Sequence, residues 1–302
     1  MTPKVGILRS WGSVCRQSNA PLPLGGKTMS GAVAVHHGAF GRTALYELDR
    51  PFVTHAHREG HLIFYVNGGK AGVDVGNTAV PLDETHGAAV SPWEPHNFDK
   101  REGEPCICLV MYIKSMWFLE NSQTAEGVLE FGRPVITVTS EIRRWILRLT
   151  SLLLEPQESA VLDGYLFEMT RVCYDQSWAR TKRRSPLGKI NSRFSDFRVR
   201  RSLRLMQENF AEEVQMDALA RAVGLSRPHF FKLFKKQMGI TPNLYLNTLR
   251  AEHAINELMT TEKSITDIGH DLGFSSQASF TRFFGSNVGI PPSEYRRVAH
   301  EV

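Results

Sequence analysis

Polar and basic side chains stand at matching positions in two stretches near the C-terminus of this 302-residue chain. Lys232 in the first stretch corresponds to Arg282 in the second, and Gln277 precedes Arg282 in that second stretch. Lys and Arg donate hydrogen bonds to O6 and N7 of guanine, and Gln pairs with N6 and N7 of adenine, when a helix carries them into the major groove of DNA. The chemistry open to these residues is therefore the recognition of base edges.

The two stretches are copies of one pattern, at residues 216–242 and 265–292. Each copy has a glycine, two phenylalanines four residues apart, a second glycine and a proline. The matching pairs are Gly224 and Gly273, Phe230 and Phe280, Phe234 and Phe284, Gly239 and Gly289, and Pro242 and Pro292. Repetition of this kind indicates that one structural unit occurs twice.

Each copy predicts two short helices joined by a tight turn. Apolar residues recur at helical spacing before Gly224, a residue type that commonly ends a helix. Ser226 is placed to cap the next helix, and Pro228 suits its first turn. Ala220 and Gly269, four residues before the turn glycines, leave room for the helices to cross closely. This pattern is typical of the helix-turn-helix, and the alternative is a repeated helical hairpin that only packs.

From about residue 198 to residue 297 the chain resembles the DNA-binding domain of the AraC/XylS family of bacterial transcription regulators. The first copy carries G-L-S from Gly224, then F-x-x-x-F-K and G-x-T-P-x-x-Y. The second copy carries G-F-x-x-x-x-x-F-x-R-x-F from Gly273, then G-x-x-P-x-E-Y-R up to Arg296. Gly285 and Ser286 stand where the family usually has Lys or Arg, which implies fewer phosphate contacts from the second copy.

Residues that lie off the apolar stripes of the final helix in each copy are the candidates for contact with DNA. They are Arg227, Pro228, Phe231, Lys232, Lys235, Gln277, Ala278, Ser279, Thr281 and Arg282. The family resemblance implies base contacts for all of them except Arg227, Lys235 and Ser279. Phe231 suits a thymine methyl group, or it packs against the protein.

A helix predicted from about residue 242 to residue 259 joins the two copies. At about 1.5 Å per residue it forms a rod of roughly 27 Å. Successive major grooves lie about 34 Å apart, so a bend in the DNA lets both final helices enter one face of a single duplex.

The N-terminal half has a different pattern. From about residue 32 to residue 113, short runs with β propensity alternate with Gly, Pro and Asp, and such a pattern indicates a β-sandwich or a small barrel. The run from His55 through His57 and His61 to Gly68 resembles the first motif of cupin barrels, which are usual in sensor domains of this family, with His61 where the motif has Glu. A later segment that ends at His96 resembles the second cupin motif.

The resemblance implies a pocket for a small-molecule effector in this barrel. Its lining would be His55, His57, His61, Phe64, Trp93 and His96. Imidazoles suit Zn, Fe, Cu or Ni, but sensor cupins of the family generally work without metal, so we expect no metal and no other cofactor. The alternative is a metal-dependent cupin enzyme fused to a DNA-binding domain.

Two amphipathic helices are predicted between the barrel and the repeat, at residues 140–155 and 158–176. In the family such a pair commonly makes a homodimer, and packing within one chain is the alternative. We therefore expect an α+β multidomain protein. Its parts are an N-terminal arm (1–30), a cupin-like β-barrel with a helical dimerisation hairpin (31–178), a linker (179–194) and an all-α DNA-binding domain (195–302) with two helix-turn-helix motifs (216–238 and 265–288).

Charge is divided unevenly along the chain. Residues 180–302 carry 20 Lys and Arg against 12 Asp and Glu, a net charge of +8, whereas residues 1–179 have a net charge of −3. A basic surface over the repeat is the electrostatic footprint that DNA binding requires. The four cysteines form no C-x-x-C pair, so we expect buried thiols in a reducing cytoplasm. The sequence has no run of 18 apolar residues and no secretory signal, so we expect no membrane span.

These observations predict a cytoplasmic, sequence-specific DNA-binding transcription regulator that is not an enzyme. The expected partners are double-stranded DNA, a small-molecule effector and RNA polymerase, and the family resemblance implies activation. The sequence holds no nucleophile elbow, phosphate loop or dinucleotide fingerprint that would favour another enzyme class. A ligand-independent architectural DNA-binding protein is a further alternative.

Overall fold

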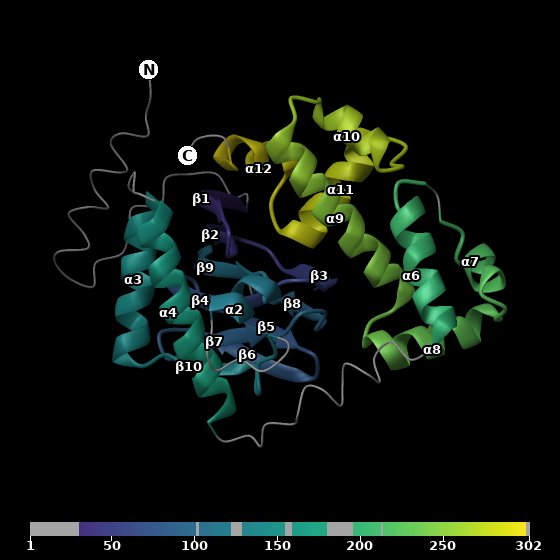
Figure 1. Ribbon diagram of the computed structural model, residues 1–302. Coiled ribbons are helices and arrows are strands. Elements are labelled where there is room, and N and C mark those ends of the chain that lie inside the picture. The colour runs from purple at the N-terminus through teal and green to yellow at the C-terminus, as the bar shows by residue number, and fades with distance from the viewer. Residues whose placement is uncertain are drawn as a thin grey trace.

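The computed structural model describes residues 30–100, 103–121, 129–154, 159–179, 196–212 and 214–299. Within these ranges the chain forms a β-rich N-terminal region and a helical C-terminal region, which lie side by side (Figure 1). The predicted N-terminal arm and the predicted linker lie outside the described residues, apart from Ser30 and Ala179.

The β-rich region contains two antiparallel sheets. One sheet has the strand order β1 (Gly31–Gly38), β2 (Gly41–Leu48), β9 (Cys106–Ile113), β4 (Gly60–Gly68), β7 (His86–Val90), β10 (Val135–Thr137). The other sheet has the order β3 (Phe52–His55), β8 (His96–Phe98), β5 (Ala71–Val75), β6 (Thr78–Leu82). Side chains of both sheets join one hydrophobic cluster, so the sheets pack against each other.

The central strand β9 shows how the sequence distributes its side chains. Successive side chains of a strand point to opposite faces, and every residue of β9 is buried. Cys106, Cys108, Val110 and Tyr112 join the cluster between the sheets, whereas Leu109, Met111 and Ile113 join a second cluster beneath helices. A strand covered on both faces has such an unbroken apolar run because both faces exclude water.

Helices cover the outer face of the larger sheet: α2 (Ser115–Asn121), α3 (Ser140–Leu154) and α4 (Ser159–Trp178) (Figure 1). The helices predicted at residues 140–155 and 158–176 are thereby confirmed to within two residues. Ile142, Ile146 and Leu149 of α3 are fully buried. These residues of the apolar stripe of α3 thus pack within the chain, and the predicted homodimer stays a prediction.

The helical region consists, in the described residues, of α6 (Phe197–Asn209), α7 (Met216–Ala222), α8 (Arg227–Met238), α9 (Pro242–Thr260), α10 (Ile265–Asp271), α11 (Gln277–Val288) and α12 (Pro292–Ala299). The four helices of the repeat are α7, α8, α10 and α11, and they lie where the repeat predicts them. The joining helix α9 is also where the sequence places it. Figure 1 shows α9 running between the two pairs.

Glycines and phenylalanines of the repeat explain its local geometry. Gly224 has φ +73° and Gly273 has φ +77°, a left-handed conformation that favours glycine at a helix end. Phe280 and Phe284 are fully buried on the inner side of α11. A Cβ at Gly269 would lie only 3.0 Å from the Cβ of Phe280, so the predicted close crossing of α10 and α11 is confirmed.

The two regions are in direct contact through polar and apolar groups. Thr248 of α9 donates from Oγ1 to the carbonyl oxygen of Ala56 at 2.8 Å. Arg58 Nε lies 2.9 Å from Glu252 Oε2, also on α9. The hydrophobic cluster between the sheets continues into α9, α10, α11 and α12. The β-rich region therefore packs against α9, the helix that joins the two helix pairs.

Three thiols in the described residues are free and buried: Cys106, Cys108 and Cys173, as the sequence predicts. Cys15 lies outside the described residues. No helix in the part of the chain that the structure describes has the length and apolar character needed to cross a bilayer.

Candidate functional site

The first helix pair presents basic side chains on the outer side of α8. Arg227, Pro228, Lys232 and Lys235 are exposed, opposite a buried face that includes Phe230, Phe234 and Met238. This arrangement follows from helical periodicity, because the aromatic residues lie three to four positions apart and share one face. The structure thus presents these four candidates to solvent together.

Phe231 differs from the other candidates on α8. It is half-buried, its ring lies 6.0 Å from that of Phe230, and the guanidinium of Arg227 lies 5.6 Å from its centroid. Arg227 also donates to Asp217 Oδ2 at 3.1 Å. Phe231 therefore packs partly against the protein, and part of its ring stays accessible for an apolar contact.

The second helix pair presents a less basic surface. Gln277, Ala278 and Arg282 of α11 are exposed, and Ser279 and Thr281 are half-buried. Gln277 Oε1 accepts a hydrogen bond from Thr266 Oγ1 at 2.9 Å. The cap of α11 comes from Ser276, whose Oγ accepts from the backbone N–H of Ser279 at 3.2 Å. The cap fixes where α11 begins and therefore which residues reach outward.

The edge of α11 borders the β-rich region. Thr281 and Arg282 line a pocket of about 350 Å³ together with Arg50 and Phe52. A Cβ at Gly289 would meet the ring of Phe52 at 2.6 Å, so β3 approaches the end of α11 closely. Two candidates for DNA contact thus lie at the contact between the regions.

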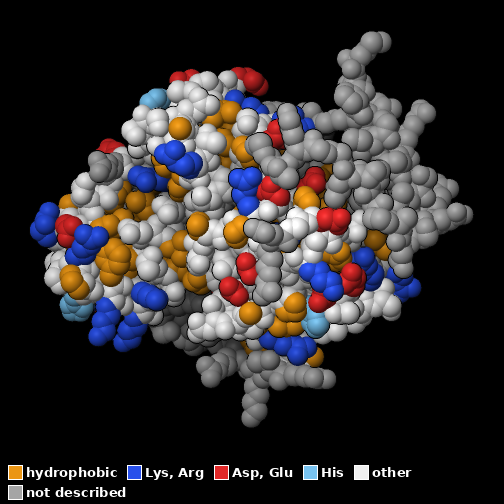
Figure 2. Space-filling view, turned by 180° about the vertical axis from the view of Figure 1, so that it is seen from behind, with side chains coloured by type: hydrophobic (Ala, Val, Ile, Leu, Met, Phe, Trp, Pro, Cys, Tyr) orange, Lys and Arg blue, Asp and Glu red, His pale blue; other side chains and the backbone are white. Residues whose placement is uncertain are grey.

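Basic side chains gather on one side of the helical region. Figure 2, seen from behind, shows Lys and Arg at its left edge, the side on which α6, α7 and α8 lie, and further Lys and Arg scattered over the rest of that face. The exposed basic residues of these helices are Arg200, Arg201, Arg204, Arg221, Arg227, Lys232, Lys235 and Lys236. Such a surface attracts phosphate groups over a range set by the salt concentration.

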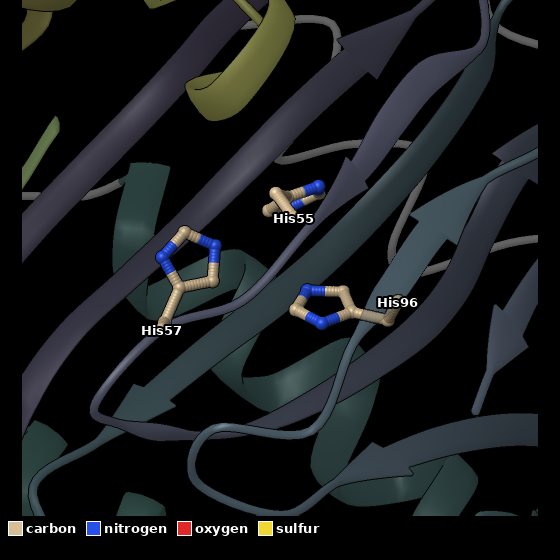
Figure 3. A group of neighbouring side chains, drawn as sticks. All are labelled: His55, His57 and His96. Carbon is tan, nitrogen blue, oxygen red and sulfur yellow. The ribbon is translucent and has the colours of Figure 1, made fainter. Parts of the chain in front are cut away.

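Histidines form a second candidate site, inside the β-rich region. His55 ends β3 and pairs with His96 at the start of β8, His57 follows β3, and His61 lies on β4. All four side chains are buried, with 2–7% of each residue exposed. Ring centroids of neighbouring members lie 4.3 Å (His55 to His96), 4.6 Å (His57 to His61) and 4.7 Å (His61 to His96) apart. In Figure 3 the rings of His55, His57 and His96 surround a common space.

Hydrogen bonds orient two of these rings. The Nδ1 atoms of His55 and His96 lie 2.8 Å and 2.9 Å from the carbonyl oxygens of Val53 and Glu94. Because a carbonyl oxygen only accepts, Nδ1 carries the proton and Nε2 keeps its lone pair. Buried ring nitrogens without a hydrogen-bond partner are Nε2 of His57, Nε2 of His96 and both nitrogens of His61.

Burial keeps the rings of this histidine cluster neutral. Desolvation lowers the pKa of each of the four imidazoles below its ordinary value, and for His57, His61 and His96 the neighbouring imidazoles lower the pKa further. Neutral imidazoles with free lone pairs can accept hydrogen bonds or coordinate a metal ion.

The structure does not place the side chains of Phe64 and Trp93 in the histidine cluster, although the backbone N–H of Trp93 donates to the carbonyl oxygen of His57 at 2.7 Å. Phe64 lies on the opposite face of β4 from His61, in the hydrophobic cluster beneath the helices. His61 and Phe64 are three residues apart on β4, so their side chains point to opposite faces of the strand, because successive side chains alternate. Trp93 stacks on Tyr245 of α9 at 5.1 Å and so belongs to the contact between the regions.

Two residues beside the histidine cluster were not predicted from the sequence. The ring of Tyr112 lies 4.3 Å from that of His61, and the guanidinium of Arg42 lies 3.6 Å from the centroid of Tyr112. Arg42 then donates from Nη1 to the hydroxyl of Tyr295 in α12 at 2.9 Å. These buried groups connect the histidine cluster with the helical region.

Comparisons with known proteins agree on the C-terminal part. Residues 219–298 match the family model described as a helix-turn-helix domain. The lactose operon transcription activator of Staphylococcus xylosus is 31% identical over 98 residues, which are 32% of this chain and 35% of that protein. An uncharacterized HTH-type transcriptional regulator of Staphylococcus aureus (strain COL) is 36% identical over 102 residues, 34% of this chain and 14% of that protein. The chain thus spans about a third or less of these relatives.

Solved structures extend the similarity to both regions. The apo form of a ToxT variant from Vibrio cholerae strain SCE256 has a TM-score of 0.54 and 14% identity, and the match covers 87% of this chain and 98% of that chain. Wild-type ToxT from the same strain, solved with a bound unsaturated fatty acid, has a TM-score of 0.52 and 14% identity. That match covers 91% of this chain and 99% of the ToxT chain. At this identity the likeness shows the fold alone.

Fold and site together define a two-region protein whose C-terminal region is a helix-turn-helix domain. The sequence motifs of that domain resemble those of the AraC type.

Proposed function

We propose that the protein is a sequence-specific DNA-binding transcription regulator that reads DNA with α8 and α11. The observation that carries this proposal is the duplicated helix pair, in which buried phenylalanines hold each second helix while its outer side chains stay exposed for contact. Arg282 and Lys232 suit guanine, and Gln277 suits adenine. Lys235 and the other exposed basic residues of the first pair supply phosphate contacts.

The spacing of the two pairs supports the proposal. The joining helix α9 has 19 residues, which corresponds to about 28 Å at 1.5 Å per residue. Successive major grooves lie about 34 Å apart, so a modest bend in the duplex brings two grooves to α8 and α11. One chain would then cover two adjacent turns of DNA.

The test is selection of duplexes from a random pool by the full-length protein, followed by footprinting of the selected duplex. We expect an enriched sequence and protection of two segments about one helical turn apart. Binding without sequence enrichment, or protection of a single segment, would contradict the proposal.

We propose further that a ligand in the β-rich region changes the affinity for DNA. Residues 55–58 alternate between two environments. His55 and His57 lie in the histidine cluster, whereas Ala56 shares a hydrophobic cluster with residues of α9 and Arg58 pairs with Glu252 of α9. A ligand that moves this segment would also move α9, the helix that joins the two helix pairs. Such a ligand changes the affinity for DNA because it binds one of two conformations of the protein more tightly than the other. The structurally similar ToxT has been solved with a bound unsaturated fatty acid, which supports the proposal that this protein also responds to a small molecule.

Activation, contact with RNA polymerase and a cytoplasmic location remain proposals that rest on the resemblance to the AraC/XylS family. Homodimerisation through α3 and α4 is a proposal as well, supported by the exposure of Leu147 (44%) and Val161 (42%) on these helices. A metal-dependent enzyme stays the alternative function, because the four buried imidazoles would suit a metal centre.

A further inference from the structure

We propose that the histidine cluster binds one divalent transition-metal ion, with Zn²⁺ as the representative, through His55, His57 and His96. The family resemblance favours a metal-free pocket, and the sequence shows neither how deeply the rings are buried nor whether their nitrogens have partners. The structure shows that the rings are buried and that several of their nitrogens have no hydrogen-bond partner. Both observations favour a metal ion.

Geometry is the first argument. One nitrogen from each of the three rings lies within 4.8 Å of the others. Nitrogen ligands on a tetrahedral ion, bound at about 2.0–2.1 Å, lie roughly 3.3 Å apart. A small rotation of each ring therefore closes the site around an ion. His61 borders the same space, with its ring 4.6 Å from His57 and 4.7 Å from His96.

The second argument is the state of the ring nitrogens. Burial of an unpartnered polar atom is unfavourable, yet His57, His61 and His96 bury ring nitrogens that have no hydrogen-bond partner. A metal ion would satisfy Nε2 of His57 and of His96. The backbone carbonyls that bind Nδ1 of His55 and His96 are the outer partners that commonly orient metal-binding imidazoles.

Ligand type selects the class of ion. Imidazole nitrogens suit Zn²⁺, Ni²⁺, Co²⁺ and Cu²⁺, whereas Mg²⁺ and Ca²⁺ prefer oxygen ligands. The described cluster contributes imidazoles and no carboxylate, so it does not fit the two-histidine, one-carboxylate centre typical of non-haem iron enzymes.

A regulatory role for this ion rests on the proposed function. An ion held by His55 and His57 fixes the segment that contacts Thr248 and Glu252 of α9. Occupancy of the site should therefore change the affinity for DNA, whereas metal binding itself does not depend on any DNA function.

The first experiment measures metal binding in the absence of DNA. Full-length protein is treated with a chelator, freed of it, and titrated with ZnCl₂ by calorimetry. We expect one Zn²⁺ per chain and a higher melting temperature, because a ligand that binds only the folded state stabilises it. Co²⁺ should give the visible absorption bands of a protein-bound ion, and MgCl₂ should give no binding.

Variants locate the site. His57→Ala and His96→Ala should each weaken Zn²⁺ binding by at least about 10- to 100-fold, the range for loss of even an outer partner. His86→Ala is the matched control, because His86 on β7 bonds to Asp83 outside the cluster. The His86→Ala variant should bind Zn²⁺ with the same affinity as the unaltered protein. Absence of Zn²⁺ binding by the unaltered protein overturns the proposal, whether or not the variants fold. Undiminished binding by both cluster variants also overturns it.

The second experiment separates this proposal from the proposed function. Affinity for the selected duplex is measured with chelator and with saturating Zn²⁺. A difference that His57→Ala abolishes supports metal-dependent regulation. Equal affinities, with Zn²⁺ bound, overturn the regulatory role but not the metal site. Absence of DNA binding in both conditions overturns the proposed function instead.

Discussion

Arg282 of α11 and Lys235 of α8 are both exposed, but they should contribute differently to the proposed binding of DNA. Arg282→Ala should cost about 1–3 kcal/mol at the selected site and relax the preference at one base pair, because a guanidinium pairs with one guanine. Lys235→Ala should weaken all duplexes alike, because a phosphate contact carries no sequence information. Competition binding to selected and random duplexes measures both effects. Equal losses for Arg282→Ala on the two kinds of duplex would defeat its assignment.

Glu252 predicts a pH dependence at the contact between the regions. Burial raises the pKa of this carboxyl group from 4.5 to about 7, although Arg58 opposes the shift. Between these two values the folded protein keeps the proton that the unfolded chain has released. The free energy of unfolding should therefore fall as pH rises from about 4.5 to about 7, and this contribution should be constant above that range.

The variant Glu252→Gln isolates this contribution. Its stability relative to the unaltered protein should increase across the same pH window, by up to roughly 3 kcal/mol at 1.36 kcal/mol per pKa unit. The buried histidines contribute the opposite slope, because their pKa values are lowered, and taking the difference between the two proteins removes their effect. Denaturant unfolding at several pH values tests this, with the exposed Glu208→Gln as control. A difference that does not vary with pH would contradict the prediction.

At the scale of elements, the two turn glycines form a matched pair. Gly224 and Gly273 have nearly the same φ, but a Cβ at Gly273 would lie 2.4 Å from the carbonyl oxygen of Ala211, whereas a Cβ at Gly224 meets no atom within 4 Å. Gly224→Ala should lower the free energy of unfolding by about 1–2 kcal/mol, the cost of a left-handed residue with a Cβ. Gly273→Ala should lower it by more, since backbone atoms must also move. Chemical denaturation of both variants measures the two free energies of unfolding. If both variants lose the same amount, the backbone around Ala211 moves away from the added Cβ at little cost.

The helices of the repeat could be predicted from the sequence because their signals are local. A glycine that ends one helix, a serine that caps the next and apolar residues three to four apart all lie within one short stretch. The order of the strands could not, because β2 pairs with β9 and β9 pairs with β4 across long separations in the chain. Tyr112 is a neighbour of His61 because β4 pairs with β9, and the sequence does not show that pairing. The resemblance to cupin motifs implied that the histidines share a pocket, but it did not give the burial that leaves their nitrogens unpartnered.

At the scale of the molecule, function depends on how the two regions are joined. Thr248 and Glu252 make polar contacts from the helical side to Ala56 and Arg58 of one segment, and Tyr295 makes another to Arg42 of β2. Polar contacts at such a boundary favour one relative placement of the regions, because a displaced arrangement leaves buried donors without acceptors. The regulation proposed above would act through these same contacts.

Tyr295→Phe tests whether this boundary is built as described. The variant keeps the aromatic ring beside Phe284, 5.7 Å away, but removes the hydroxyl that accepts from Arg42. A hydrogen bond to a charged group contributes about 1.5–3 kcal/mol, so the free energy of unfolding should fall by that amount. Tyr65→Phe is the control, because its hydroxyl bonds to the neutral carbonyl of Gly68 within the β-rich region, for which about 0.5–1.5 kcal/mol is expected. Amide hydrogen exchange should accelerate in α12 and β1 for the first variant and not for the second. If both variants leave exchange in α12 unchanged, the pair of Arg42 and Tyr295 does not hold the regions together, and the route from the histidine cluster to the reading helices must run through residues 55–58 alone.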